Sequence, residues 1–368
     1  MKLAIIGAST GQVPLCLKAR EMGLETICFA WEQGALCRDL VSRFYPISIT
    51  EKEQILAVCQ GEKVDGVVTN ASEATIDVVA YLATRLRLHG LNDVVLQRIK
   101  NKAETRRLTN EIKGLTPVEF RVYDGSAQTF FPCVVKPVTS SGKRGVSFVG
   151  NEKSFDKAVK YALEASASGV LVEKCVDGDE ISIEALSYEG KHQVIQITDK
   201  QNSGAPHFVE IGHHQPSMLP SPVKDAIRNV VPEILSAIGF TDGPSHIEMR
   251  VSKRGDLYLI EVNPRGGGDE ISNTLVGLST DFDYVKGMID VALGVYTPVD
   301  VHDVSCAGIY YLCQQTAHLL PYFENAEQKP WLVKKNISCN KLSAATGNRD
   351  RCGYMIYNYS SKITFDYD

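Results

Sequence analysis

The sequence predicts an α/β protein in three parts, and three observations carry that prediction. Short apolar runs alternate with helix-like segments over the first 90 residues, which is typical of a parallel sheet covered by helices. Strand-like runs joined by turns dominate residues 130–263, and further strand-like runs follow residue 300. With 368 residues, of which 44% are hydrophobic and 23% charged, the chain is long enough for two or three domains.

The first part, residues 1–95, is expected to form a small parallel sheet. Its Gly7-Ala8-Ser9-Thr10-Gly11 segment lacks Gly-x-Gly-x-x-Gly spacing, and no acidic residue closes the second strand. We therefore interpret it as a tight strand-to-helix turn rather than a dinucleotide site, although substrate can still contact it or residues 70–73 at the next strand end. The expected strands are 3–6, 25–30 and 66–69, and the expected helices are 13–22, 51–60 and 73–87.

Composition excludes several classes of protein. The net charge is -5, and no Lys/Arg block is interleaved with aromatic residues, so a nucleic-acid partner is not expected. The first residues lack the apolar core of a signal peptide, and no run reaches membrane-spanning length. The ten cysteines contain no Cys-x-x-Cys, which favours reduced, mostly buried thiols. We therefore expect a cytoplasmic protein without a membrane partner.

The second part begins with an expected helix at 99–112 that carries Lys102 near its start. A short apolar strand then ends in Lys136, and residues 138–146 form a loop of small residues with two cations, Lys143 and Arg144. Such a loop can lay backbone amides and positive charge over a triphosphate. The alternative is a solvated turn, and the loop is not a P-loop because Gly-x-x-x-x-Gly-Lys-Ser/Thr is absent.

Two later strands, residues 245–251 and 256–263, predict a hairpin with an oxygen-rich cation site. Glu261 follows Glu248 by thirteen residues, and the turn at 252–255 can bring the two carboxylates opposite each other. By alternation, the face of Glu261 should also carry Leu257, Leu259 and Asn263. Carboxylate and amide oxygens suit Mg²⁺ bound to a nucleotide triphosphate. The alternative is a solvated sheet face with Arg250 or Arg265 as counter-ion.

A further strand makes the pattern specific. Residues 172–182 read Val-Glu-Lys-x-Val-x-Gly-x-Glu-x-Ser, after the lysine-ended strand and the glycine-rich loop and before Glu248 and the Glu-Val-Asn-Pro-Arg of 261–265. In this order the motifs resemble the ATP-grasp superfamily of ligases. The resemblance covers about residues 95–300, and it implies an ATP-grasp fold in which two α+β subdomains grip ATP.

The resemblance implies three domains and a role for each matching residue. Residues 1–95 would precede an ATP-grasp domain at 96–300 with a mobile lid at about 115–175, and 301–368 would form a small β-rich closing domain. Arg265 matches the arginine that stabilises charge during phosphoryl transfer. The magnesium ligands, with Mn²⁺ as a substitute, would be Glu248, Glu261 and Asn263. The ATP-binding residues would be Lys102, Lys136, Ser141, Gly142, Glu173, Lys174, Val176 and Glu180, where residues 173–176 pair with adenine and Glu180 binds the ribose. A plain surface lysine is the alternative for Lys102.

The implied chemistry is acyl activation. A carboxylate attacks the terminal phosphate of ATP, and an amine then displaces phosphate from the acyl phosphate. The Gly-Gly-Asp-x-Ile sequence at 267–271 and the segment 207–217 are similar to the branch that contains L-amino acid ligases, so we expect an amino acid or related small carboxylate as acyl donor. We assign no role to Glu184. The expected substrate-binding residues are Glu210, His214, His246, Gly267 and Gly268.

Alternatives remain for the site and for the activity. Zinc at the paired His213 and His214 is disfavoured because no acidic or cysteine partner stands at ligand spacing, and which of the two faces the site stays open. A carboxylase, or a nucleotide-pathway ligase that uses bicarbonate or a phosphorylated amine, is the second hypothesis. A regulatory module that binds ATP without turnover is the third.

The tail, residues 301–368, is expected to be β-rich, with strands at 308–313, 331–335 and 354–358. It resembles the small closing domain of the same ligases, which would cover the acceptor side. The expected partners are a small-molecule carboxylate and amine, and the expected assembly is a homo-oligomer, with a dimer as the favoured state.

Overall fold

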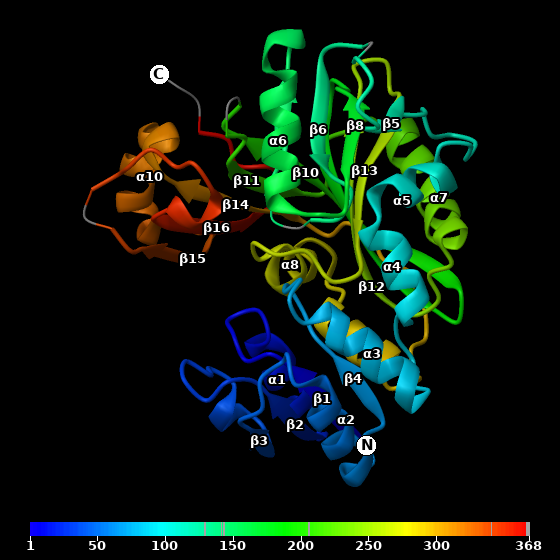
Figure 1. The fold of residues 1–368 in the computed structure, drawn as a ribbon. Coiled ribbons are helices and arrows are strands. Elements are labelled where there is room, and N and C mark those ends of the chain that lie inside the picture. The colour runs from blue at the N-terminus through cyan, green and yellow to red at the C-terminus, as the bar shows by residue number, and fades with distance from the viewer. Residues whose placement is uncertain (129, 141, 143, 205–206, 340, 366–368) are drawn as a thin grey trace.

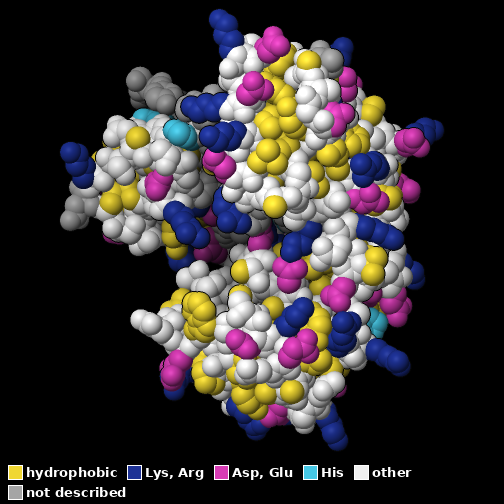
Figure 2. Space-filling view, in the orientation of Figure 1, with side chains coloured by type: hydrophobic (Ala, Val, Ile, Leu, Met, Phe, Trp, Pro, Cys, Tyr) yellow, Lys and Arg dark blue, Asp and Glu magenta, His cyan; other side chains and the backbone are white. Residues whose placement is uncertain are grey.

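The computed structural model describes residues 1–365 except 129, 141, 143, 205–206 and 340. It contains three sheets. One lies in the N-terminal lobe, one lies in the upper lobe, and the largest runs from the centre of the molecule into the C-terminal lobe (Figure 1). Where these lobes meet, the surface is hollowed and basic and acidic side chains line its edge (Figure 2).

The N-terminal lobe is the predicted parallel sheet. Its four strands run in the order β3-β2-β1-β4, and the short β3, which borders β2, was not predicted from the sequence. Apolar residues of β1 and β2 are fully buried on both faces, as expected for a parallel sheet covered by helices. The elements are β1 (Lys2–Ile6), α1 (Val13–Glu21), β2 (Glu25–Phe29), β3 (Arg43–Tyr45), α2 (Lys52–Glu62), β4 (Gly66–Val68) and α3 (Ile76–Leu86).

The predicted helix at 99–112 is wrong as a single element. The structure has two helices, α4 (Asp93–Lys100) and α5 (Lys102–Thr109), separated by Asn101. Asn101 has an extended backbone, and its side chain accepts a hydrogen bond from the Glu104 amide. Asn101 is therefore the N-cap of a new helix, and Lys102 occupies the first position of α5.

The upper lobe contains a four-stranded antiparallel sheet in the order β5-β8-β6-β7. Helix α6 (Phe155–Ala165) packs on it through apolar residues such as Phe155 and Val159. The strands are β5 (Phe120–Val122), β6 (Cys133–Pro137), β7 (Ser147–Val149) and β8 (Val170–Lys174). The loop between β6 and β7 is the glycine-rich segment predicted to cover phosphates.

The largest sheet has eight strands in the order β13-β12-β9-β10-β11-β14-β16-β15. The last three strands come from the tail, so the expected β-rich end extends the central sheet instead of forming a sheet of its own (Figure 1). The strands are β9 (Asp179–Tyr188), β10 (Lys191–Asn202), β11 (Glu210–Gln215), β12 (Gly243–Val251), β13 (Leu257–Asn263), β14 (Cys306–Leu312), β15 (Leu332–Ile337) and β16 (Gly353–Tyr359).

Helices pack on this sheet from both sides. Residues of α7 (Ser221–Ile238) share one apolar core with β9, β12 and β13. Residues of α9 (Tyr284–Ala292) join a second core with the N-terminal sheet. The remaining helices are α8 (Val276–Thr280), which precedes α9, and α10 (Leu320–Asn325), which lies in the C-terminal lobe.

The cysteines depart from the prediction at one place. Eight are free, and six of those are buried. Cys339 and Cys352 form a disulfide, with Cα atoms 5.3 Å apart. The pairing of β15 with β16 sets Ile337 opposite Gly353 and so brings the two cysteines together, which sequence spacing did not reveal. Among the described residues, no helix is long and apolar enough to cross a membrane.

Candidate active site

The β12–β13 hairpin brings two carboxylates together as predicted. Glu248 lies directly opposite Glu261, and His246 lies opposite Asn263. Further along, Met249 pairs with Leu259, so the strands shift register and Ile260 is the extra residue.

This bulge corrects the predicted face of β13. Leu257 and Leu259 are buried in the apolar core beside Met249. Glu261 and Asn263 instead share the other face with Glu248, because one extra residue reverses the alternation beyond it. Simple alternation would have put the Glu261 carboxylate in the apolar core.

The paired carboxylates are held in different electrostatic states. Burial alone would raise the pKa of Glu248, but Lys200 and His246 beside it hold that pKa well below its usual value. Burial raises the pKa of Glu261, and the nearby charge of Glu248 adds to the effect although Lys102 opposes it. A cation shared by both carboxylates would remove this conflict. The donor set of Glu248, Glu261 and Asn263 therefore fits an oxygen-preferring ion such as Mg²⁺.

The two predicted lysines face this hairpin from different lobes. Lys102 Nζ lies 3.7 Å from Glu261 Oε1 and donates to the Ser140 carbonyl at 2.7 Å. Lys136 Nζ is buried and lies 2.5 Å from Glu173 Oε2. Burial lowers the pKa of Lys136 while Glu173 opposes that effect. Lys102 thus contacts the carboxylate pair directly, whereas Lys136 contacts Glu173 and influences the pKa of Glu261 only through its charge.

Glu173 has a structural partner that the sequence reasoning missed. Arg106 Nε donates to Glu173 Oε1 at 2.7 Å, and both side chains are buried. Burial would raise the pKa of Glu173, but Lys136 and Arg106 lower it to about 2. Because Arg106 stands four residues after Lys102 on α5, helical periodicity places both on one face, which was an available signal.

The expected adenine linker leads from β8 into β9. Lys174 is exposed, and the Val176 carbonyl accepts a hydrogen bond from Arg250 at 3.0 Å. At Gly178 a Cβ atom would lie 2.4 Å from the Val251 carbonyl oxygen, so only glycine fits there. Glu180 Oε2 lies 3.6 Å from Arg250. Gly142 of the lid loop is exposed, whereas Ser141 lies outside the described residues.

Arg265 lies between the hairpin and the N-terminal lobe. Its guanidinium donates to the Gly266 carbonyl at 3.1 Å and lies 3.5 Å from Glu73. Its Nε is buried and has no hydrogen-bond partner among the described residues. A buried donor of this kind normally finds a partner, and an anion beside the hairpin would supply one. The 70–73 turn also contacts the helical segment Ile271–Leu275 that follows, because Asn70 Nδ2 donates to Asn273 Oδ1 at 2.6 Å.

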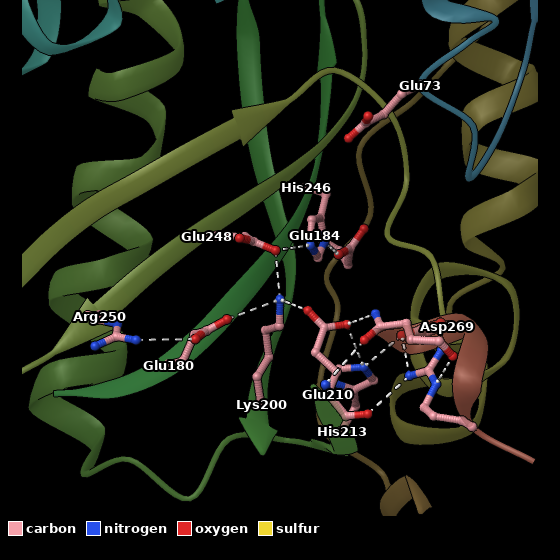
Figure 3. Close-up of polar contacts among 12 residues, drawn as sticks. Glu73, Glu180, Glu184, Lys200, Glu210, His213, His246, Glu248, Arg250 and Asp269 are labelled. Atoms are coloured by element: carbon pink, nitrogen blue, oxygen red, sulfur yellow. Dashed lines mark hydrogen bonds and ion pairs between the residues drawn. The ribbon is translucent and has the colours of Figure 1, made fainter. Parts of the chain in front are cut away.

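Glu184, for which no role was predicted, is fully buried and connects the glycine loop, residues 266–268, to the β12–β13 hairpin. Its carboxylate contacts His246 Nδ1 and accepts a hydrogen bond from the Gly267 amide at 2.9 Å (Figure 3). His246 Nε2 then lies 3.4 Å from Glu248 Oε1. Burial would lower the pKa of His246, but Glu184 and Glu248 raise it to about 9. A Cβ at Gly267 would lie 2.7 Å from Glu184, whereas Gly268 has open space.

Lys200 of β10 was missed, although it lies at the centre of the acidic residues. Its Nζ is 2.6 Å from Glu248, 3.0 Å from Glu210 and 3.4 Å from Glu180 (Figure 3). Burial would lower the pKa of Lys200, yet these three carboxylates raise it well above its usual value. The lysine stands in a polar part of β10, between Asp199 and Gln201, and nothing in this segment indicated carboxylates on three other strands.

The paired histidines face different surroundings. His213 Nε2 lies 3.8 Å from Glu210 and 3.5 Å from Asp269. His214 instead packs 4.7 Å from the Tyr310 ring and contacts the Tyr357 hydroxyl at 3.1 Å. The expected absence of acidic partners is therefore wrong, because the fold brings Glu210, His213 and Asp269 within ligand distance of one another.

The C-terminal lobe reaches this acidic side through Arg351. Its guanidinium donates two hydrogen bonds to Asp269, at 2.7 and 2.9 Å, and stacks 3.6 Å from the Tyr311 ring centre. Asn348 donates to Glu210 at 2.9 Å. Burial would raise the pKa of Asp269, but His213 and Arg351 hold it far below its usual value. Sequence reasoning did not identify either C-terminal residue, since their partners are more than 80 positions away.

Comparison with known proteins agrees with this geometry. Residues 129–274 match the family model described as an ATP-grasp domain. The structure superposes on an L-amino acid ligase from Bacillus licheniformis with a TM-score of 0.79 and 26% identity, over 98% of this chain and 93% of that one. The chain contains an ATP-grasp domain.

Other matches point to the same superfamily. A formate-dependent phosphoribosylglycinamide formyltransferase of Nitratiruptor sp. is 25% identical over 321 residues, which is 81% of this chain and 79% of that protein. N5-carboxyaminoimidazole synthetase of Staphylococcus aureus, complexed with ADP, has a TM-score of 0.76 at 16% identity over 98% of this chain and 93% of that one, a likeness of fold. The predicted ATP-grasp fold and the class of ATP-dependent, ADP-forming ligases that make carbon–nitrogen bonds are confirmed.

Proposed function

We propose that this ATP-grasp ligase activates a small carboxylate, an amino acid or a close relative, as an acyl phosphate and couples it to an amine. The observation that carries the proposal is the position of Arg265, whose buried Nε has no partner among the described residues. It stands two residues after the end of β13, the strand that sets Glu261 opposite Glu248. That arrangement suits an anion whose charge grows during phosphoryl transfer. The likeness to an L-amino acid ligase along 98% of the chain supports the substrate class.

Each group of residues in the site has its own proposed role. Lys102 and Lys136 supply positive charge for the nucleotide phosphates, and Lys102 also contacts the Ser140 carbonyl at the start of the glycine-rich loop. Glu248, Glu261 and Asn263 would hold Mg²⁺, or Mn²⁺ in its place, which when bound neutralises phosphate charge. Arg265 stabilises the phosphoryl group as the carboxylate oxygen attacks it. The amine then attacks the acyl carbon, and phosphate leaves with the oxygen that came from the carboxylate.

The lobes suggest how the site is enclosed. We propose domains at 1–95, 96–300 and 301–368, and a lid at about 115–175 within the second. We also propose that the protein is a homodimer, which sedimentation velocity tests. Arg351 and Asn348 of the last domain bind Asp269 and Glu210. The C-terminal domain would thereby fix the acidic side of the site, where the amine is expected. We propose that His213, and not His214, lies on the substrate side, and the contact of His213 with Glu210 supports this.

A second candidate keeps the fold and changes the substrates. The relatives named formate-dependent phosphoribosylglycinamide formyltransferases favour formate or bicarbonate as the acid, or a phosphorylated amine as acceptor. Such an acceptor needs cations for its phosphate, whereas Lys200 and Arg351, which lie beside Glu210 and Asp269, are already paired with carboxylates. This balance favours the amino acid proposal.

A screen of amino acids in pairs, read by phosphate release and by product mass, tests the proposal. We expect phosphate release that needs a carboxylate and an amine together, and a product whose mass equals the two substrates less water. Turnover with formate or bicarbonate but without an amino acid would contradict the amino acid assignment and support the second candidate. ATP binding without ADP formation in any mixture would contradict both.

A further inference from the structure

The ammonium of Lys200 fills the space that a metal ion would need. The carboxylates of Glu180, Glu210 and Glu248 each place an oxygen within 4.8 Å of the others, a set that could hold a metal ion. Lys200 Nζ lies 3.4, 3.0 and 2.6 Å from the Oε1 atoms of these residues in that order (Figure 3). With only 3% of its side chain exposed, Lys200 is enclosed by the groups it neutralises.

A divalent cation and the ammonium cannot share this position. Both are positive, and in a site with little water their repulsion is weakly screened. Glu248 Oε1 accepts the short hydrogen bond from Lys200 and is also a proposed metal ligand. A metal ion that takes this oxygen must therefore displace the ammonium.

The three carboxylates do not depend on Lys200 alone for their positions. Glu180 Oε2 lies 3.6 Å from Arg250, and Glu248 Oε1 lies 3.4 Å from His246. Glu210 Oε2 accepts a hydrogen bond from Asn348 at 2.9 Å. Removing the ammonium should leave the three oxygens in place and expose a ready-made cation site.

We propose that Lys200 is the resting counter-ion of this site, and that it excludes free divalent metal until the nucleotide arrives. The inference rests on the proposed role of Glu248 as a metal ligand. The phosphates of ATP give the displaced ammonium a new anionic partner while their bound metal takes its place on Glu248. Metal and nucleotide then enter together, so the empty enzyme does not hold a metal ion alone.

Titration with Mn²⁺, followed by loss of the free-ion electron paramagnetic resonance signal, tests this without measuring activity. For nucleotide-free protein we expect Lys200→Met and Lys200→Gln to bind Mn²⁺ at least about tenfold more tightly than wild type, because a blocking charge is gone. Lys200→Arg keeps the charge and should bind as weakly as wild type. Adding Glu210→Gln to Lys200→Met should reverse the gain. If Lys200→Met does not fold, the comparison is made with Lys200→Gln alone.

Lys286→Met is the matched control, because Lys286 is half exposed and pairs only with Asp290 of its own helix among the described contacts. Wild type is also titrated with a non-hydrolysable ATP analogue. If Mn²⁺ binds with the analogue, yet neither neutral variant gains affinity without it, the role of Lys200 is wrong and the metal assignment stands. If Mn²⁺ does not bind even with the analogue, the metal assignment itself fails, and the inference with it.

Discussion

Glu248 of β12 faces Glu261 of β13 directly across the strand pair. Because this pairing costs stability without a cation, Glu261→Gln should leave the folded protein at least as stable and lower turnover by about two orders of magnitude or more. ADP release and thermal unfolding of the same preparation measure the two effects. Glu104→Gln, whose side chain on α5 is partly exposed and pairs with Arg107, is the control. ADP release at the wild-type rate by Glu261→Gln would exclude Glu261 as a metal ligand.

Arg265→Ala should retain ATP binding and lose catalysis. The guanidinium lies beside the hairpin with its Nε unpaired among the described residues, so we expect kcat to fall by about two orders of magnitude or more. Arg265→Lys should recover little, since an ammonium cannot reproduce the planar fork. Calorimetric titration with ATP and steady-state kinetics provide the two readouts. A loss confined to ATP affinity would show that Arg265 binds nucleotide without acting in the transition state.

Arg106→Met should destabilise the fold. It leaves the buried Glu173 carboxylate with Lys136 as its remaining charge partner, and breaking a buried ion pair costs about 3–5 kcal/mol. Urea unfolding measures the change. Arg107→Met is a close control, because that neighbouring side chain is mostly exposed and should shift stability by less than about 0.5 kcal/mol. Equal effects of the two substitutions would contradict the buried role of Arg106.

The ion pair between Arg106 and Glu173 predicts that the stability of the protein depends on pH. The pKa of Glu173 is lowered to about 2 in the folded protein, so its ion pairs stabilise fully above about pH 4.5, the ordinary value, and are lost as pH falls toward 2. The stability gap between wild type and Arg106→Met should therefore narrow over that range. Urea unfolding at several pH values between 3 and 6 follows it. A gap that stays constant or widens on acidification would show that the pKa of Glu173 is not depressed.

Arg351→Ala should weaken substrate binding while leaving ATP binding unchanged. Its two hydrogen bonds to Asp269 and its stacking on Tyr311 join the C-terminal lobe to the glycine loop. We expect KM for the amine substrate to rise about tenfold, since the acidic side would lose its fixed geometry. Arg349→Ala, an exposed neighbour, serves as control. An unchanged KM in Arg351→Ala would remove the C-terminal lobe from substrate binding.

Sequence patterns predicted the parts of the site that lie within one local element. The hairpin turn and the spacing of Glu248 and Glu261 were enough to predict that they face each other, which the register confirms. Alternation failed at Ile260, because a bulge changes the face of a strand without a clear mark in its composition. The helix break at Asn101 coincides with a residue type that favours helix N-caps.

Residues whose partners are distant in sequence could not be found in this way. Lys200 gathers carboxylates from β9, β11 and β12, and Arg351 reaches Asp269 across 82 positions. Their roles depend on the order β12-β9-β10-β11-β14-β16 in the large sheet. A single sequence carries no record of that order, so these charges resembled ordinary surface residues.

Oxygen transfer from substrate to phosphate tests the central claim most directly. With a carboxylate substrate labelled with ¹⁸O at both oxygens, attack on the terminal phosphate and later displacement by the amine must leave one ¹⁸O in the released phosphate. Phosphorus NMR or mass spectrometry reads the label. We predict one ¹⁸O per phosphate during coupled turnover, with the other retained in the amide product. Phosphate that carries no ¹⁸O from the substrate would contradict an acyl phosphate and the function proposed for this site.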